Sequence, residues 1–144
     1  MLKILVSACL IGCNCRYIGD NCKNEAVRSL AEKHILIPVC PEQLGGLTTP
    51  RQPSERQGEK VVMSDGSDVT AQFSEGAENA LEIARLMKVD FAILKAHSPS
   101  CGKGIIYDGT FSGEKCEGNG VTAELLMENG IPVFTEKELD TLRL

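Results

Sequence analysis

Three of the seven cysteines lie just past apolar, β-branched runs that are typical of buried strands. These strand-end cysteines are Cys9, Cys40 and Cys101. Because the carboxyl ends of parallel strands meet at one edge of a sheet, where ligands bind, we expect the three thiols to converge. Soft thiolates favour zinc or an iron–sulfur cluster, and three protein ligands leave one coordination position open for a substrate. The pattern therefore predicts a catalytic metal centre.

The alternative is that buried cysteines act only as small apolar side chains. The chain has no C-x-x-C pair, the usual mark of a local metal site. Three thiols at strand ends nevertheless favour the metal centre. Cys13, Cys22 and Cys116 lack that placement and are expected to be incidental or redox-sensitive thiols. Cys15 stands beside Arg16, whose charge would lower the pKa of the thiol and make it reactive.

Polar side chains close to the strand-end cysteines are candidates for catalysis. Glu42 follows Cys40 by two positions and is the candidate acid–base group, the alternative being a solvated loop carboxylate. Ser98 and Ser100 precede Cys101, where a hydroxyl would orient water or substrate, or simply cap a turn. These three side chains form the predicted catalytic set.

Four further residues are candidates for substrate binding: Arg16, Gly45, Gly46 and Arg51. A guanidinium group can bind an anion, and paired glycines let a substrate approach the backbone closely. All four are equally ordinary as surface features.

Strand and helix patterns alternate along the chain. Four apolar runs are typical of strands: residues 3–8, 35–39, 91–96 and 131–134. Helical periodicity occupies the intervals between them, at residues 27–34, 73–87 and 120–129. This alternation predicts an α/β fold, a single-domain three-layer α/β/α (Rossmann-like) architecture over residues 1–144 with a small, mainly parallel sheet.

The remaining segments are predicted from turn chemistry. Residues 41–66 are rich in Pro, Gly, Gln and Arg and are expected to form a long functional loop, with a short strand at 60–63. Asp108-Gly109 favours a two-residue type I′ hairpin that covers the site. Thr135 and Glu138 have the spacing of a capping box for a final short helix.

The composition excludes several classes of protein. The net charge of −5, from 15 Lys and Arg against 20 Asp and Glu, argues against binding a polymeric nucleic acid. No apolar run approaches the roughly 20 residues of a membrane span, and the N-terminal segment lacks a signal-peptide cleavage site. We therefore expect a cytoplasmic protein, in a reducing compartment where cysteines serve metals or catalysis more often than disulfides.

Six sets of short motifs follow one another along the chain: Val6–Leu10 with Arg16-Tyr17, Cys40–Leu47 with Thr49–Arg51, Asp68–Thr70, Ser98–Gly102, Ile106–Gly113 and Gly120–Ala123. In this order, and over nearly the whole chain, they resemble the bacterial thiouracil desulfidase family, once known only as a domain of unknown function.

The resemblance implies a 4Fe-4S cluster on the three strand-end cysteines and the conversion of thiouracil to uracil and sulfide. The fourth iron would bind the sulfur of the substrate and act as a Lewis acid on the thiocarbonyl carbon, which water attacks. Glu42 would handle the protons, and Ser98 or Ser100 would position the reacting groups. The overall change is hydrolytic and consumes no electron donor. Cys13 and Cys22 are additions to the family pattern.

Two other functions stay open on the sequence. One is cluster-dependent sulfur transfer from another small thio-compound. The other is a non-catalytic module in which the thiols hold zinc while Arg51 and the glycines cradle an anion. For the desulfidase, the expected partner is a small thiolated nucleobase, and the sequence does not indicate an oligomeric state.

Overall fold

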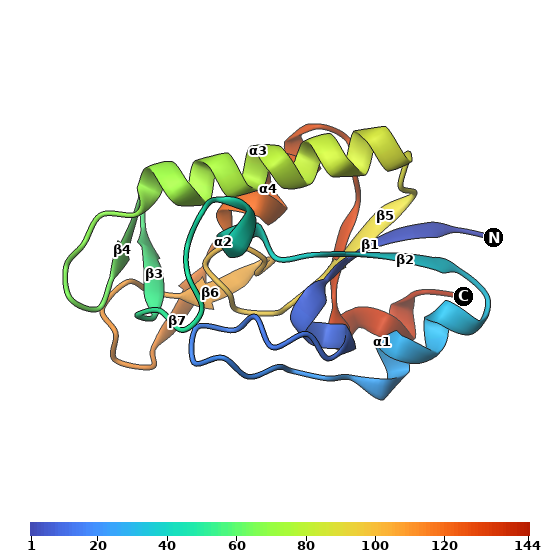
Figure 1. Cartoon of the computed structure of the whole chain (residues 1–144), viewed down its shortest axis with the longest axis horizontal. Coiled ribbons are helices and arrows are strands. Elements are labelled where there is room, and N and C mark those ends of the chain that lie inside the picture. The colour runs from blue at the N-terminus through green and yellow to red at the C-terminus, as the bar shows by residue number, and fades with distance from the viewer.

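Four parallel strands form the sheet that positions the site, in the order β2-β1-β5-β8. The computed structural model describes all 144 residues (Figure 1). The strands are β1 (Lys3–Ser7), β2 (Ile35–Val39), β5 (Phe91–Leu94) and β8 (Val133–Thr135). Each strand falls on one of the apolar runs in the sequence, and all three pairings are parallel. The predicted α/β fold with a small parallel sheet is confirmed.

One face of the sheet is covered by two long helices, α3 (Thr70–Met87) and α4 (Val121–Glu128) (Figure 1). Leu5 of β1 packs in a core that includes Ala84 of α3 and Leu126 of α4. Both helices match the periodic segments in the sequence, although α3 begins earlier than expected.

The opposite face is covered by shorter elements, because successive side chains of a strand point to opposite sides. Ile4 and Val6 pack with Val27 of α1 (Glu25–Ser29) and with the short 3₁₀ helix η1 (Ala8–Ile11). The three-layer arrangement is therefore confirmed. None of the helices combines the length and apolar character needed to cross a membrane.

The helix predicted at residues 27–34 lies two residues earlier in the chain, at residues 25–32, and only its first part is α-helical. It consists of α1 followed by a single 3₁₀ turn, η2 (Leu30–Glu32). The side-chain oxygen of Asn24 accepts a hydrogen bond of 3.1 Å from the backbone N–H of Val27, which caps the helix at its start. The capping box at Thr135 and Glu138, by contrast, is present as predicted and starts η3 (Glu136–Thr141).

Residues 41–66 are more regular than their composition indicates. They contain the short helix α2 (Pro41–Leu44) and an antiparallel hairpin of β3 (Ser54–Gln57) and β4 (Lys60–Met63). The predicted strand at 60–63 is confirmed, and the expectation of one long loop is wrong. The sequence of β3, Ser-Glu-Arg-Gln, is polar and lacks the apolar alternation that marks a strand. This strand is therefore defined only by its pairing with β4.

A second hairpin has a longer turn than predicted. Because β6 (Ile105–Tyr107) pairs with β7 (Lys115–Glu117), the two-residue turn expected at Asp108-Gly109 is wrong. The Glu55 carboxylate accepts hydrogen bonds from the backbone N–H groups of Gly109 and Phe111, at 3.0 and 3.1 Å. A side chain from a distant hairpin therefore sets the conformation of this loop.

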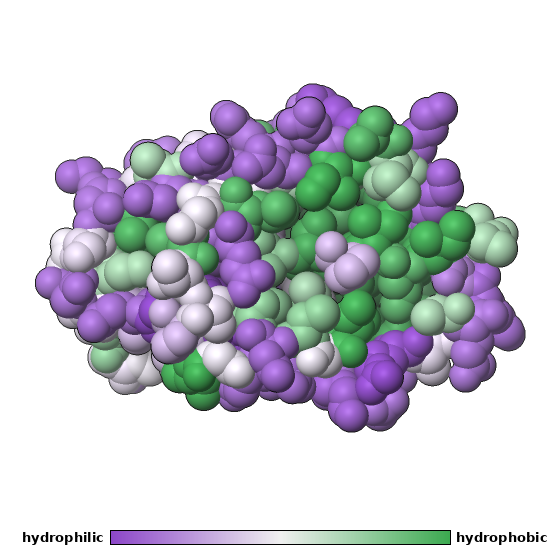
Figure 2. All heavy atoms as spheres, in the orientation of Figure 1, coloured by the Kyte–Doolittle hydropathy of each residue, from purple (hydrophilic) through white to green (hydrophobic).

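The strand β2 lies at the edge of the sheet and presents apolar side chains to solvent. Figure 2 shows apolar residues gathered over this strand and polar residues around the rim. Pro38 lies within β2, where the missing N–H removes one donor that a further strand would need. The edge is therefore less suited to pairing with another chain.

Helix α2 approaches α3 closely through two glycines. A Cβ added to Gly45 would lie 1.9 Å from the carbonyl oxygen of Gln72, and one added to Gly76 would lie 1.9 Å from that of Pro41. Both positions therefore require glycine for steric reasons. This contact fixes α2, the helix that carries Glu42.

Replacing Gly76 by alanine is expected to destabilise the protein by about 1–3 kcal/mol, because the added methyl group pushes α2 away from α3. In an exposed helix interior the same change would be stabilising by about 1 kcal/mol, so the predicted sign is the opposite of the ordinary one. Urea unfolding measures the change, with exposed Glu75→Ala on the same helix as the control. A Gly76→Ala protein at least as stable as the wild type would contradict the close contact.

Candidate active site

A cavity of about 440 Å³ opens at the carboxyl edge of the sheet. Its wall includes Ser7 at the end of β1, Val39 at the end of β2, and Lys95 just after β5. The neighbours of β1 in the sheet are β2 on one side and β5 on the other. Parallel sheets bind ligands at such a point, where the connections turn to opposite sides. The topology therefore places this cavity where a ligand is expected.

The three strand-end cysteines all line this cavity. Cys9 and Cys101 are buried, with 8% and 4% exposure, and Cys40 is partly buried. The structure thus brings together thiols that lie far apart in the sequence, as the strand topology predicts. Their role as metal ligands stays a prediction at this point.

Two thiols outside the strand-end set also line the cavity, the buried Cys15 and the partly buried Cys22, and the sequence placed neither of them there. Cys15 is only 6% exposed and packs in one buried cluster with Cys9, with Cys40 against the same cluster. The expectation that Arg16 makes Cys15 reactive is wrong, because the pKa of Cys15 is raised to about 11. The neighbouring Cys40 thiol lowers this pKa, but the neighbouring Cys9 thiol and burial raise it by more. Arg16 instead pairs with Asp20 at 3.2 Å.

The pKa values of two strand-end cysteines, Cys40 and Cys101, are raised as well. Burial raises the pKa of Cys101 to about 12. The hydroxyl groups of Ser7 and Ser100 act in the opposite direction and lower it, but burial has the larger effect. The pKa of Cys40 is raised by its hydrogen bond with Cys15 and then by burial. Such thiols ionise when a cation replaces their protons, so this donor set fits a thiolate-bound metal centre.

The spacing of the donors bears on the kind of metal centre. No group of three or more His, Cys, Asp or Glu side chains lies close enough together to hold a single metal ion. A multinuclear iron–sulfur cluster spreads its thiolate ligands more widely than a lone tetrahedral zinc ion does. The zinc-binding module considered from the sequence therefore has no preformed site in this structure.

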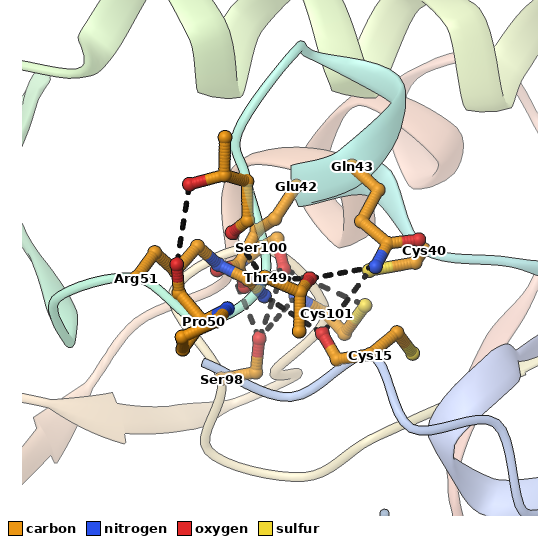
Figure 3. Close-up of polar contacts among 11 residues, drawn as sticks. Cys15, Cys40, Glu42, Gln43, Thr49, Pro50, Arg51, Ser98, Ser100 and Cys101 are labelled. Atoms are coloured by element: carbon orange, nitrogen blue, oxygen red, sulfur yellow. Dashed lines mark hydrogen bonds and ion pairs between the residues drawn. The ribbon is translucent and has the colours of Figure 1, made fainter. Parts of the chain in front are cut away.

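Glu42 is held inside the cavity by two partners (Figure 3). The Nε of Arg51 donates to Oε1 at 3.0 Å, and the Ser100 hydroxyl donates to Oε2 at 3.0 Å. The side chains of Arg51 and Glu42 are only 4% and 15% exposed. The alternative of a solvated loop carboxylate is therefore excluded, and Glu42 has a fixed orientation toward the strand-end cysteines.

Arg51 has a structural task rather than the anion-binding one expected from the sequence. Besides Glu42, its guanidinium donates to the carbonyl oxygens of Cys15 at 2.9 Å and Thr48 at 3.1 Å, and to the Thr49 hydroxyl at 3.0 Å. Each guanidinium nitrogen thus has a partner within the protein. Arg51 joins the carboxylate to the loop that carries Cys15.

The two serines before Cys101 have different environments. The Ser98 hydroxyl accepts hydrogen bonds from the backbone N–H groups of Ser100 and Cys101, both at 3.1 Å, and so caps the turn. Ser100 is 2% exposed, and its hydroxyl contacts Glu42 and lies 3.7 Å from the sulfur of Cys101. Ser100 therefore bridges the carboxylate and a strand-end cysteine, while Ser98 shapes the loop.

The other predicted substrate-binding residues are less central. Arg16 lines the cavity, with its side chain 34% exposed. Gly45 and Gly46 are not part of the cavity wall. Gly45 is explained by its contact with α3, and Gly46 has a φ of +93°, which favours glycine in the turn after α2.

The cavity wall includes polar residues that sequence reasoning missed, among them Ser7, Glu55 and Tyr107. Ser7 is the last residue of β1, and its hydroxyl accepts a hydrogen bond of 2.9 Å from the backbone N–H of Lys95. The strand-end argument that found Cys9 applies equally to Ser7. Glu55 gave no such signal, because its polar surroundings in the sequence are typical of an exposed loop.

The sequence was compared with known families and proteins. The 2-thiouracil desulfurase family matches residues 4–138. An uncharacterized protein of Bacillus subtilis (strain 168), YbbK, is 44% identical over 149 aligned residues, which cover 96% of this chain and 99% of YbbK. A solved structure of TudS, described as a 4Fe-4S-dependent thiouracil desulfidase, is similar with a TM-score of 0.93 and 46% identity, covering 99% of this chain and 95% of that one. The chain belongs to the 2-thiouracil desulfurase family.

Proposed function

We propose that this protein is a 4Fe-4S-dependent desulfidase that hydrolyses the thiocarbonyl group of a thiolated nucleobase, converting 2-thiouracil to uracil and sulfide. One observation carries the proposal: the three strand-end thiols, two buried and one partly buried, share a cavity with the hydrogen-bonded pair Glu42 and Ser100. Membership of the family and the similarity to TudS support the same activity.

Cys9, Cys40 and Cys101 would hold the cluster as thiolates. When bound, it supplies a Lewis-acidic iron with high affinity for sulfur and an open coordination position for the substrate. Ser7 and Ser100 hydrogen-bond with Cys101 and stabilise its thiolate form. These two hydroxyl groups therefore favour the thiolate form of Cys101 that a cluster ligand needs.

Glu42 supplies the acid–base function. Its Oε1 is occupied by Arg51 and its Oε2 by Ser100, so the carboxylate is oriented before the substrate binds. Glu42 takes one proton from the attacking water and passes it to the sulfur, and then moves the remaining hydroxyl proton to the departing sulfur as the carbonyl forms. Water and a thiocarbonyl thus give a carbonyl and hydrogen sulfide without any change of oxidation state. Ser100 orients the water and keeps the carboxylate in place.

The cavity dimensions suit a small, flat substrate. A volume of about 440 Å³ lies within the range that holds small molecules. Tyr107 and Pro53 provide apolar surface on the wall. We infer that a free base or a single nucleoside fits here, whereas the net charge of −5 disfavours a polynucleotide.

Turnover of 2-thiouracil tests the proposed activity. Protein reconstituted with iron and sulfide under anaerobic conditions is expected to release uracil and sulfide in equal amounts, measured by chromatography and by a colorimetric sulfide assay. Sulfide without uracil would favour sulfur transfer or decomposition. A protein that carries a full cluster and releases neither product would contradict the proposal.

Replacing Cys101 by serine is expected to abolish the visible absorbance of the reconstituted protein and to reduce its bound iron to a residual level, because one of three thiolate ligands is lost. Cys116→Ser is the matched control, since Cys116 is exposed and lies outside the cavity wall. Iron and sulfide analysis measures both. Retention of a complete cluster by Cys101→Ser would refute the ligand assignment.

Replacing Glu42 by glutamine is expected to lower kcat by about 10²–10⁴-fold, because the amide keeps the shape of the side chain and cannot move a proton. The cluster content stays that of the wild type. Glu59→Gln is the control, since Glu59 is exposed in the turn between β3 and β4. Wild-type kcat in a cluster-loaded Glu42→Gln protein would remove Glu42 from the reaction.

A further inference from the structure

Cys15 is the one thiol buried in the cavity to which the proposed reaction gives no task. It is 6% exposed, more buried than Cys9 at 8%, and it lines the same cavity as the strand-end cysteines. It packs in one buried cluster with Cys9, and Cys40 packs against the same cluster. Cys15 is therefore part of the group of sulfur atoms that faces the cofactor position.

The backbone of Cys15 is held in place from several directions. Its carbonyl oxygen accepts a hydrogen bond of 2.9 Å from Arg51, and the sulfur of Cys40 lies 3.8 Å from the same oxygen (Figure 3). Its N–H donates to the carbonyl oxygen of Cys13 at 2.9 Å. Because Arg51 also holds Glu42, the position of this thiol is tied to that of the catalytic carboxylate.

We propose that Cys15 is an exchangeable fourth ligand of the cluster: its thiolate occupies the open iron position while the cavity is empty, and the sulfur of the substrate displaces it. This inference rests on the proposed function. It adds a residue that controls access to the reactive iron.

The exchange is balanced in atoms and electrons. The bond between iron and the Cys15 sulfur breaks as the bond between iron and the thiocarbonyl sulfur forms, and Cys15 regains a proton when it is released. The reverse exchange occurs when the product leaves, and no oxidant or reductant takes part. The Cys15 thiolate and the thiocarbonyl group both bind iron through a soft sulfur atom, so one can replace the other at the same position.

Occupation of the open iron position by Cys15 would weaken the apparent binding of external sulfur ligands. If the open position is free for only a tenth of the time, the apparent affinity for any external sulfur ligand falls about tenfold. The benefit is that a cluster held by four protein thiolates leaves no iron open to water and oxidants. Removing Cys15 is therefore expected to strengthen binding of external ligands and to weaken the protection of this iron.

The test compares wild type, Cys15→Ala and Cys15→Ser with Cys13→Ser, all reconstituted anaerobically as full-length protein. Cys13 is the matched control, because it lies in the same loop and is exposed. Sodium hydrosulfide is the probe ligand, titrated while the visible and electron paramagnetic resonance spectra are recorded. Circular dichroism and iron content confirm that each variant is folded and loaded.

Both Cys15 variants are expected to bind hydrosulfide about tenfold more tightly than wild type, while Cys13→Ser is unchanged. With ferricyanide, they are expected to lose one iron of the cluster faster than wild type, seen as the signal of a three-iron cluster. Equal affinity and equal iron loss in all four proteins would overturn the proposal. Loss of the whole cluster from the Cys15 variants alone would also overturn it, by making Cys15 a permanent ligand.

Failure of the proposed function gives a different result. In that case the wild-type protein itself takes up no cluster, or a loaded wild type leaves 2-thiouracil unchanged. Failure of the Cys15 inference leaves a wild type that is loaded and active, with Cys15 variants that bind hydrosulfide as it does.

Discussion

Parallel strands of one sheet all end at the same edge, and the site depends on this constraint. The carboxyl ends of β1, β2 and β5 deliver Cys9, Cys40 and the loop that leads to Cys101 to a single cavity. No local cysteine motif is needed, because the long-range order of the sheet replaces the short spacing found in small metal-binding loops. A change that shifts one strand against its neighbours would therefore separate the thiols, even though no cavity residue is altered.

Hydrogen bonds around the cysteines position the polar side chains of the cavity. The buried guanidinium of Arg51 binds both Glu42 and the carbonyl of Cys15, so one side chain orients the Glu42 carboxylate and the loop of Cys15 together. Ser100 connects the same carboxylate to Cys101. The close contact of Gly45 and Gly76 supports this arrangement from outside the cavity, because it fixes the helix that carries Glu42.

Sequence patterns predicted the features that arise from local periodicity. The apolar runs gave all four strands of the sheet, and strand-end position was enough to bring Cys9, Cys40 and Cys101 into one cavity. Predictions failed where distant contacts decide the structure. The turn after β6 is set by Glu55, the polar strand β3 is defined by its partner, and Arg51 is occupied by the protein itself. Cys15 was misjudged for the same reason, since its neighbours in space are other thiols rather than Arg16.

The central claim is that the converging thiols hold an iron–sulfur cluster, and anomalous X-ray scattering at the iron absorption edge tests it most directly. Crystals of the reconstituted protein, grown without oxygen, are predicted to show a compact group of four iron atoms in the cavity, bonded to the sulfur atoms of Cys9, Cys40 and Cys101. Iron bound elsewhere, or a cavity without iron in a protein that contains four iron atoms per chain by analysis, would contradict the account.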